Sequence, residues 1–190
     1  MITPNANHQS VAEHAVGLMF ALAKNTLHVD ARIRQGHWDK AIYSGLEVYG
    51  KHVGLIGLGR IGRDVVNILQ PLNMEIMVYD PYVSEKDLPR SVTKVDCLEE
   101  VFPWADFISI HCPLTSDTKS LVGISEFKLM KQTAFIINTA RGGIIDEAAL
   151  ATALEKGLIA GAALDTFTTE PPANDNPLLG MTNVIVTPHI

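Results

Sequence analysis

Three glycines in the segment GLGRIG, residues 57–62, have the spacing of a loop that binds a dinucleotide. An apolar segment at 52–56 precedes them, and apolar residues at helical spacing follow. In this setting Gly57 permits a tight turn, Gly59 lets the backbone approach a pyrophosphate, and Gly62 lets a helix pack closely. The helix start would direct unpaired N–H groups at the phosphates. This context favours a cofactor site over a glycine-rich turn without a ligand.

An acidic residue, Asp80, stands eighteen residues after Gly62. This is close to the offset of ~20 residues at which a carboxylate accepts hydrogen bonds from an adenosine ribose. The same carboxylate would repel a 2′-phosphate, so the pattern favours NAD over NADP. The structural alternative for Asp80 is the opening residue of the turn DPY. Arg60 either adds positive charge beside the phosphates or is a solvated arginine at the helix start, and both interpretations stay open.

Three polar residues, Arg141, Glu170 and His189, each follow a predicted strand or lie in a proline-containing turn. A guanidinium suits a planar carboxylate because it donates two parallel hydrogen bonds. Taken singly, the three fit a surface salt bridge, a solvated acid in a turn and a core histidine. Taken together, they fit the interconversion of a 2-oxo acid and a 2-hydroxy acid.

The chemistry of that reaction explains why these residue types belong together. Hydride transfer to a ketone carbon leaves an alkoxide that must be protonated. A histidine can donate that proton and accept it back in the reverse direction. A carboxylate beside the ring would hold it in place and favour its charged form. We therefore assign Glu170 to His189 and Arg141 to the substrate carboxylate.

The elements that must position these residues begin with an amphipathic helix. Ser10 and Glu13 have the spacing of a capping box, and apolar residues recur at helical spacing from 11 to 22. Residues 26–50 have weaker periodicity and several glycines, which indicates an irregular arm. We place a boundary near Gly50.

After residue 50, short apolar segments alternate with segments of helical spacing, which is the pattern of βαβ units. The short segments lack in–out alternation, as expected of parallel strands covered on both faces. The sequence therefore predicts an α/β fold, a doubly wound Rossmann parallel sheet with helices on both faces. The clearest expected helices are 60–72, which a left-handed Asn73 would end, and 147–156, which Asp146 would begin and Gly157 would end. The expected strands are 52–56, 75–79, 107–110, 134–138, 160–164 and 184–187.

Composition narrows the function class. The chain has 190 residues, is 47% hydrophobic and carries a formal net charge of −6. Its 15 basic residues are scattered along the chain, which disfavours a nucleic-acid or anionic-membrane surface. Cys97 and Cys112 lack the spacing of a disulfide framework or a zinc site, so we expect no metal. With no signal sequence or membrane span expected, the predicted location is the cytoplasm.

The chain resembles the NAD-binding domain of the D-isomer-specific 2-hydroxyacid dehydrogenases, including phosphoglycerate dehydrogenase-like members. The resemblance runs nearly from end to end. It rests on an ordered series of motifs: SVAEHA at 10–15, GLGRIG at 57–62, YDPY at 79–82, HCPLTSDT at 111–118, NTARGGIIDEAAL at 138–150, ALDTFTTEPP at 163–172, and NPLL with TPH near the end.

The resemblance implies roles for particular residues. Arg141 would bind the substrate carboxylate, and Glu170 would assist His189 as acid and base. Asp165 would lie near the nicotinamide carboxamide, although it could instead cap a turn, and Cys112 could simply pack. We interpret His111 as structural. The remaining cofactor contacts implied by the family fall at Arg60, Ile61, Asp80, Cys112, Pro113, Thr139 and Ala140.

The resemblance also implies a homodimer. Residues 1–50 would form a linker helix and dimerisation arm, residues 51–190 would form the NAD-binding domain, and the substrate domain would be largely absent from this chain. We therefore expect NAD as cofactor and a 2-oxo or 2-hydroxy acid as substrate, with little turnover by the isolated chain. The alternative is a module that binds NAD and dimerises without activity of its own. Formate dehydrogenases are disfavoured because Glu170 stands where they are expected to carry glutamine.

Overall fold

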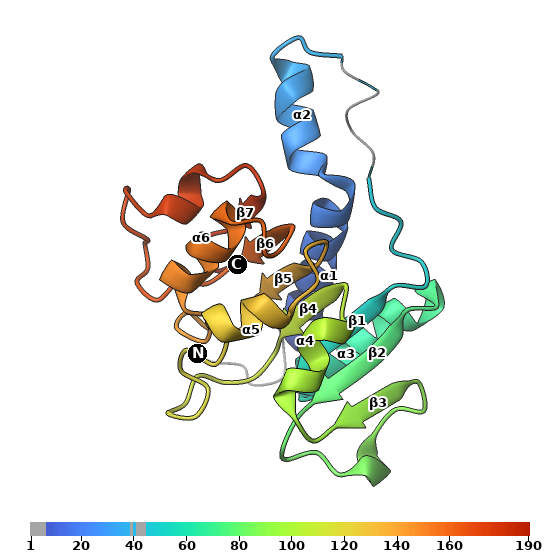
Figure 1. The fold of residues 1–190 in the computed structure, drawn as a ribbon. Helices are drawn as coiled ribbons and strands as arrows, with labels where there is room; N and C mark the ends of the chain where they lie inside the picture. The colour runs from blue at the N-terminus through green and yellow to red at the C-terminus, as the bar shows by residue number, and fades with distance from the viewer. Residues whose placement is uncertain (1–6, 39, 41–44) are drawn as a thin grey trace.

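The computed structural model of the chain describes residues 7–38, 40 and 45–190 (Figure 1). At its centre lies a sheet in which every pair of neighbouring strands runs parallel. The strand order is β3-β2-β1-β4-β5-β6-β7. The strands are β1 His52–Ile56, β2 Glu75–Tyr79, β3 Val92–Val95, β4 Phe107–Ile110, β5 Phe135–Asn138, β6 Gly161–Leu164 and β7 Val184–Val186.

The direction of winding reverses at the centre of the sheet. From β1 the chain moves outward through β2 to β3, then returns to the other side of β1 and continues from β4 to β7. This is the doubly wound order, so the predicted fold class is confirmed. In such sheets, ligands bind in the crevice at the carboxyl ends of the strands where the order reverses. The ends of β1 and β4 mark that position here.

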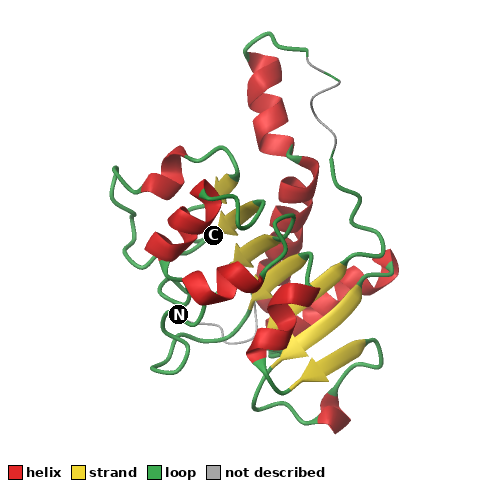
Figure 2. Cartoon of the chain, viewed as in Figure 1, coloured by secondary structure: helices red, strands yellow, loops and turns green. Residues whose placement is uncertain are grey.

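Helices cover both faces of the sheet (Figure 2). One apolar layer contains buried residues of α1 (His8–Lys24) and α3 (Arg60–Leu69), and the other contains those of three shorter helices. In the part of the chain that the structure describes, no helix is long and apolar enough to cross a membrane. The shorter helices are α4 Val101–Trp104, α5 Ile124–Leu129 and α6 Glu147–Glu155, with 3-10 turns at η1 Gln70–Leu72, η2 Glu85–Asp87, η3 Leu98–Glu100 and η4 Pro177–Gly180.

The six predicted strands are all present, and their burial explains why they could be recognised. Every residue of β4 and of β6 is buried, as expected for strands covered on both faces. The seventh strand, β3, was not predicted. It lies at the edge of the sheet, it is only half-buried, and its four residues include Lys94. A short, partly polar edge strand carries little hydrophobic pattern.

The first helix begins at His8, ahead of the predicted capping box. Asn7 occupies the N-cap position of α1 without a side-chain hydrogen bond, and Ser10 lies inside the helix. The capping-box prediction is therefore wrong, although the helix itself is confirmed. Its buried side packs mainly on α3 and on the sheet, in the same apolar layer.

The arm predicted as irregular contains a second helix, α2 (Thr26–Arg34). None of its residues is buried, and in Figure 1 it projects away from the sheet. Hydrophobic periodicity is weak in a helix that buries none of its residues, and this explains why the sequence did not reveal it. The ion pair between Asp30 and Arg34, one turn apart with a 2.7 Å separation, lies on its exposed surface.

Candidate active site

The glycine-rich loop connects β1 to α3 and is shaped by contacts that only glycine allows. Gly57 has φ +101°, and a Cβ there would lie 2.8 Å from the carbonyl carbon of His111. A Cβ on Gly62 would lie 2.6 Å from the carbonyl oxygen of Gly57. Gly59, at the N-cap of α3, has open space in front of it. Two glycines therefore close the loop, and the third leaves the N-terminus of a ten-residue helix accessible.

Asp80 lies beside this loop because β2 pairs with β1 in register, Ile56 against Tyr79. Its Oδ2 accepts a hydrogen bond of 2.8 Å from the backbone N–H of Leu58, and its Oδ1 accepts one of 2.9 Å from that of Tyr82. The carboxylate thus supports the glycine loop and also opens the turn that follows β2. Beside it lies a cavity of about 410 Å³, bordered by Gly57, Gly59, Asp80, Pro81, Tyr82, Cys112, Pro113 and Thr118 among others.

A larger cavity of about 840 Å³ continues from this point across the carboxyl ends of the strands. The segment from His111 to Pro113 borders both cavities, so the two meet there. Together they form one extended crevice at the place where the strand order reverses. The residues that border the larger cavity include Ile61, Cys112, Thr139, Ala140, Arg141, Asp165, His189 and Ile190.

Thr139, directly after β5, supports the assignment of this crevice to a ligand. It is 6% exposed, and its hydroxyl is buried without a hydrogen-bond partner. A buried polar atom of this kind needs a partner, and a bound ligand can provide one. The open helix start, the close glycine contacts and this hydroxyl together fit a dinucleotide. Arg60, the first residue of α3, is exposed at the same helix start.

Asn138 at the end of β5 shapes the turn that carries Arg141. Its side chain accepts from the backbone N–H of Ala140 at 3.0 Å and donates to the carbonyl of Arg141 at 2.9 Å. The next residue, Gly142, packs directly on another backbone, since a Cβ there would lie 1.9 Å from the carbonyl oxygen of Phe167. The exposed guanidinium of Arg141 donates to the carbonyl of Ala140 at 2.6 Å.

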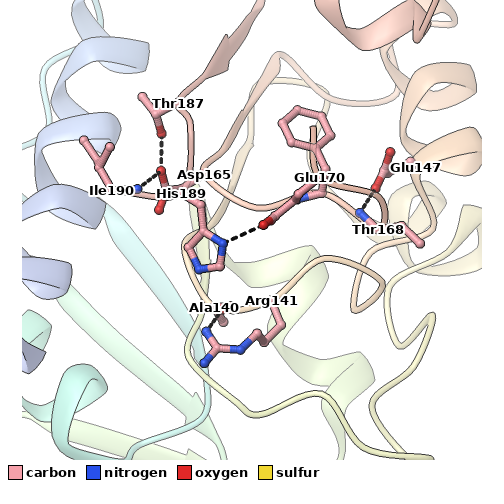
Figure 3. A network of polar contacts seen from close by, with 10 residues as sticks. Ala140, Arg141, Glu147, Asp165, Thr168, Glu170, Thr187, His189 and Ile190 are labelled. Carbon is pink, nitrogen blue, oxygen red and sulfur yellow. Dashed lines mark hydrogen bonds and ion pairs between the residues drawn. The ribbon is translucent and has the colours of Figure 1, made fainter. Parts of the chain in front are cut away.

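The segment on which Gly142 packs also carries Glu170, and Glu170 contacts His189. His189 Nδ1 and Glu170 Oε2 are 2.8 Å apart, while Glu170 Oε1 accepts from the backbone N–H of Phe167 at 3.0 Å. Figure 3 shows the imidazole between Glu170 and Arg141. The hydrogen bond from His189, aided by that from Phe167, lowers the pKa of Glu170 below its ordinary range. Glu170 therefore remains a carboxylate near neutrality.

Asp165, after β6, organises the last residues of the chain. Its side chain is 3% exposed, and its Oδ1 accepts from the hydroxyl of Thr187 at 2.6 Å and from the backbone N–H of Ile190 at 3.2 Å. Thr187 lies two residues before His189 and Ile190 one residue after it, and His189 itself adopts a left-handed conformation with φ +58°. The buried carboxylate therefore holds the turn that directs His189 toward Glu170 (Figure 3).

His111 and Cys112 lie where the two cavities meet. Burial lowers the pKa of His111 to about 4, and its Nε2 lies 2.9 Å from the hydroxyl of Ser109. Burial also raises the pKa of the Cys112 thiol to about 11. Both side chains are therefore uncharged near neutrality, and a neutral His111 agrees with a structural role.

Sequence reasoning did not identify three residues that border or support the crevice. Asn7 borders the larger cavity, Thr187 contacts Asp165, and His14 of α1 lies 3.1 Å from the hydroxyl of Thr187. For His14 a signal was present, because it lies four residues before Leu18 on a helix whose buried side is otherwise apolar. A histidine at such a position needs a polar partner from another element.

Fold and crevice together place the chain among the dinucleotide-binding domains of dehydrogenases. Its family is more specific. The model of the D-isomer specific 2-hydroxyacid dehydrogenase family, NAD binding domain, matches residues 16–190. The chain therefore belongs to this family, as its NAD-binding domain, and the resemblance inferred from its motifs is confirmed.

The curated relatives that the chain matches agree with this assignment. D-3-phosphoglycerate dehydrogenase of Methanocaldococcus jannaschii is 48% identical over 188 residues, which are 98% of this chain and 36% of the relative. The enzyme of the same name from Homo sapiens is 41% identical over 190 residues, which are 100% of this chain and 36% of the relative. The chain thus spans about a third of the length of these curated relatives.

Solved structures show the same fold. The TT0316 protein of Thermus thermophilus matches with a TM-score of 0.91 and 33% identity, covering 99% of this chain and 60% of that one. D-lactate dehydrogenase with NAD+ from Lactobacillus jensenii matches with a TM-score of 0.84 and 35% identity, covering 98% of this chain and 60% of that one.

Proposed function

We propose that the protein containing this chain transfers a hydride between NAD(H) and a D-2-hydroxy acid/2-oxo acid pair. In this proposal the chain supplies both the cofactor site and the acid–base pair. One observation carries it: the 2.8 Å contact between His189 and Glu170 lies beside the cavity that Arg141 and Ile61 also border. A domain that only bound NAD would have no need of a paired histidine there.

The cofactor, when bound, supplies the hydride in one direction and accepts it in the other. Arg141 binds the substrate carboxylate, because its planar guanidinium can donate two parallel hydrogen bonds to it. His189 donates a proton to the substrate oxygen as the carbonyl is reduced and accepts it back in the reverse direction. The contact of Nδ1 with Glu170 leaves Nε2 as the nitrogen that exchanges this proton.

Glu170 acts through His189. Because its pKa is lowered, it stays ionised and stabilises the positive charge on the ring when His189 is protonated. Its second oxygen is held by the backbone N–H of Phe167, so the carboxylate cannot rotate away without losing that bond. Glu170 therefore orients the imidazole of the acid–base group.

The adenosine end of the cofactor belongs beside Asp80, whose carboxylate would accept from the ribose hydroxyls and disfavour a 2′-phosphate. The three loop glycines and the start of α3 would face the pyrophosphate, and Asp165 would lie at the nicotinamide end. Further contacts are proposed for residues that border the crevice or stand at the start of α3: Arg60, Ile61, Cys112, Pro113, Thr139 and Ala140.

Residues 1–50 are proposed to form a linker helix and dimerisation arm, and residues 51–190 the NAD-binding unit. The support is the exposure of apolar side chains on α2 and in the segment that follows it. Helix α2 has no buried residue, and exposed Leu27 and Ile33 are followed by Trp38, which is 79% exposed. Exposed apolar side chains of this kind suit the interface of a homodimer. The two cysteines are unpaired, which agrees with a location in the cytoplasm.

A substrate panel on the complete protein tests this proposal. We begin the panel with 3-phosphoglycerate, after the names of the curated relatives, and add lactate and glyoxylate, after the names of similar solved structures. His189→Ala should lower kcat about 10²–10⁴-fold for the preferred substrate without preventing NADH binding. Asp80→Ala should weaken NADH binding, measured by the fluorescence of NADH.

A protein that shows no saturable NADH binding would refute the proposed cofactor site. A His189→Ala enzyme with unimpaired activity would refute the acid–base assignment. If the complete protein binds NADH and dimerises but is inactive on every substrate of the panel, the chain is a binding module instead.

A further inference from the structure

A chain of three polar side chains connects the first helix to the reactive end of the crevice. His14 Nε2 lies 3.1 Å from the hydroxyl oxygen of Thr187, and that hydroxyl donates to Asp165 Oδ1 at 2.6 Å. His14 Nε2 is also 3.5 Å from the same carboxylate oxygen. The side chain of His14 is 20% exposed and that of Asp165 3%, so the contacts are largely shielded from water. Three elements distant in sequence thus meet at one carboxylate.

The direction of the two hydrogen bonds follows from the number of protons that each group can donate. A threonine hydroxyl has a single proton, and here it is donated to Asp165. The hydroxyl oxygen can therefore only accept from His14, so Nε2 of His14 must carry a proton. The chain runs from the His14 N–H to the Thr187 oxygen, and from the Thr187 O–H to the carboxylate. His14 is the donor that fixes the orientation of the hydroxyl.

The carboxylate at the end of this chain occupies a distinct part of the crevice. Asp165 borders the larger cavity together with Arg141 and His189, and it does not border the cavity beside Asp80. Its Oδ1 is held by the contacts with Thr187 and with the backbone of Ile190. In the dinucleotide orientation proposed above, Asp165 therefore meets the nicotinamide end and not the adenosine end.

We propose that His14 is a positioning residue for the nicotinamide end of the cofactor, acting through Thr187 on Asp165. The inference rests on the proposed function, because it requires a cofactor in the crevice. Without the His14 donor, the Thr187 oxygen loses the hydrogen bond that it accepts, and the hydroxyl is no longer oriented from the α1 side. The hydroxyl and the carboxylate to which it donates are then less firmly placed, so Asp165 has a less defined orientation toward the ligand.

A purely structural tie between α1 and the sheet is the alternative explanation. The same helix offers a matched control, because His8 Nδ1 pairs with Asp64 Oδ2 of α3 at 2.5 Å. That pair also fastens α1 to the domain, yet neither residue borders the larger cavity. Loss of a fastening contact should destabilise the domain in either case. Loss of the His14 donor, unlike loss of His8, should weaken the binding of the nicotinamide end of a dinucleotide and leave the binding of the ADP-ribose end unchanged.

The experiment compares the affinity for NADH with that for ADP-ribose, which lacks the nicotinamide. Both dissociation constants are measured by titration calorimetry on the chain and on four variants, with thermal unfolding as a check of folding. His14→Ala removes the donor, His14→Gln restores an N–H donor, and Thr187→Val removes the hydroxyl at nearly constant volume. His8→Ala is the control. We expect His14→Ala and Thr187→Val each to raise the Kd of NADH about tenfold and to change that of ADP-ribose by less than about twofold.

The Kd of NADH for His14→Gln and for His8→Ala should lie within about twofold of its value for the chain without substitutions. The inference would be overturned if His14→Ala lowered the affinities for NADH and ADP-ribose equally, or left the affinity for NADH unchanged. It would also be overturned if His14→Gln failed to restore the affinity for NADH. If His14→Ala does not fold, Thr187→Val decides by the same comparison. An unchanged chain that binds neither ligand refutes the cofactor site itself, which distinguishes that outcome from a failure of this inference alone.

Discussion

Replacing Gly142 with alanine adds one methyl group at the contact between the turn that carries Arg141 and the segment that carries Glu170. The added Cβ would lie 1.9 Å from the carbonyl oxygen of Phe167, 2.0 Å from its carbonyl carbon and 2.5 Å from the nitrogen of Thr168. All three are backbone atoms, so no flexible side chain can move aside. Since non-bonded carbon atoms prefer a separation of about 3.5–4.0 Å, the two segments must separate by more than about 1 Å.

Two consequences follow, and they can be measured separately. Overpacking of this kind destabilises a domain by about 1–3 kcal/mol, which corresponds to a Tm lower by about 2–12 °C at this chain length. The separation also moves Arg141 relative to His189 and Glu170. A displacement of ~1 Å in a catalytic arrangement can lower the rate about 10²-fold. We therefore expect a strong loss of kcat/KM for the 2-oxo acid, while ADP-ribose, which would occupy the Asp80 end, binds with unchanged affinity.

Gly17→Ala is the matched control, because Gly17 lies within α1 and a Cβ there meets nothing within 4 Å. This substitution should stabilise the helix by about 0.5–1 kcal/mol and leave activity unchanged. The assays are thermal unfolding, ADP-ribose titration and steady-state kinetics of the complete protein. A Gly142→Ala protein with the stability and kcat/KM of the unchanged enzyme would refute the close packing and the argument built on it.

Two further predictions concern titratable groups. Because the folded-state pKa of Glu170 is lowered from an ordinary value of 4.5, its hydrogen bonds contribute stability above that value that is lost as pH falls through the lowered pKa. Urea unfolding should therefore show Glu170→Gln less stable than the unchanged protein at pH 7 and equally stable in strong acid, and a constant difference would contradict this. Burial raises the pKa of Cys112 to about 11, so iodoacetamide at pH 8 should alkylate exposed Cys97 well before Cys112, as followed by mass spectrometry. Equal alkylation of the two thiols would contradict the burial.

Much of the fold follows from local pattern. The central strands β4 and β6 are continuous apolar segments whose residues are all buried, so their burial was visible in composition alone. The strands β2 and β7 are only partly buried, but they too are mostly apolar. Local chemistry also fixed several helix ends. Asp146 accepts from the backbone N–H groups of Ala148 and Ala149 as the N-cap of α6, and Asn73 adopts the left-handed conformation predicted for it. The elements that were missed, β3 and α2, lie at an edge or project from the domain, where little apolar surface is buried.

The sequence by itself determined the types of residue available for chemistry and the order in which the chain presents them. The glycine spacing, the acid after β2 and the Arg, Glu and His near the later strands predicted a crevice with a cofactor and an acid–base pair. The tertiary structure decided which atoms meet. Glu170 and His189 meet across nineteen residues of sequence, in a turn whose Thr187 and Ile190 are both held by the buried Asp165. His14 contacts Thr187 from a helix far away in sequence. Such contacts depend on how distant elements pack, and no local spacing encodes them.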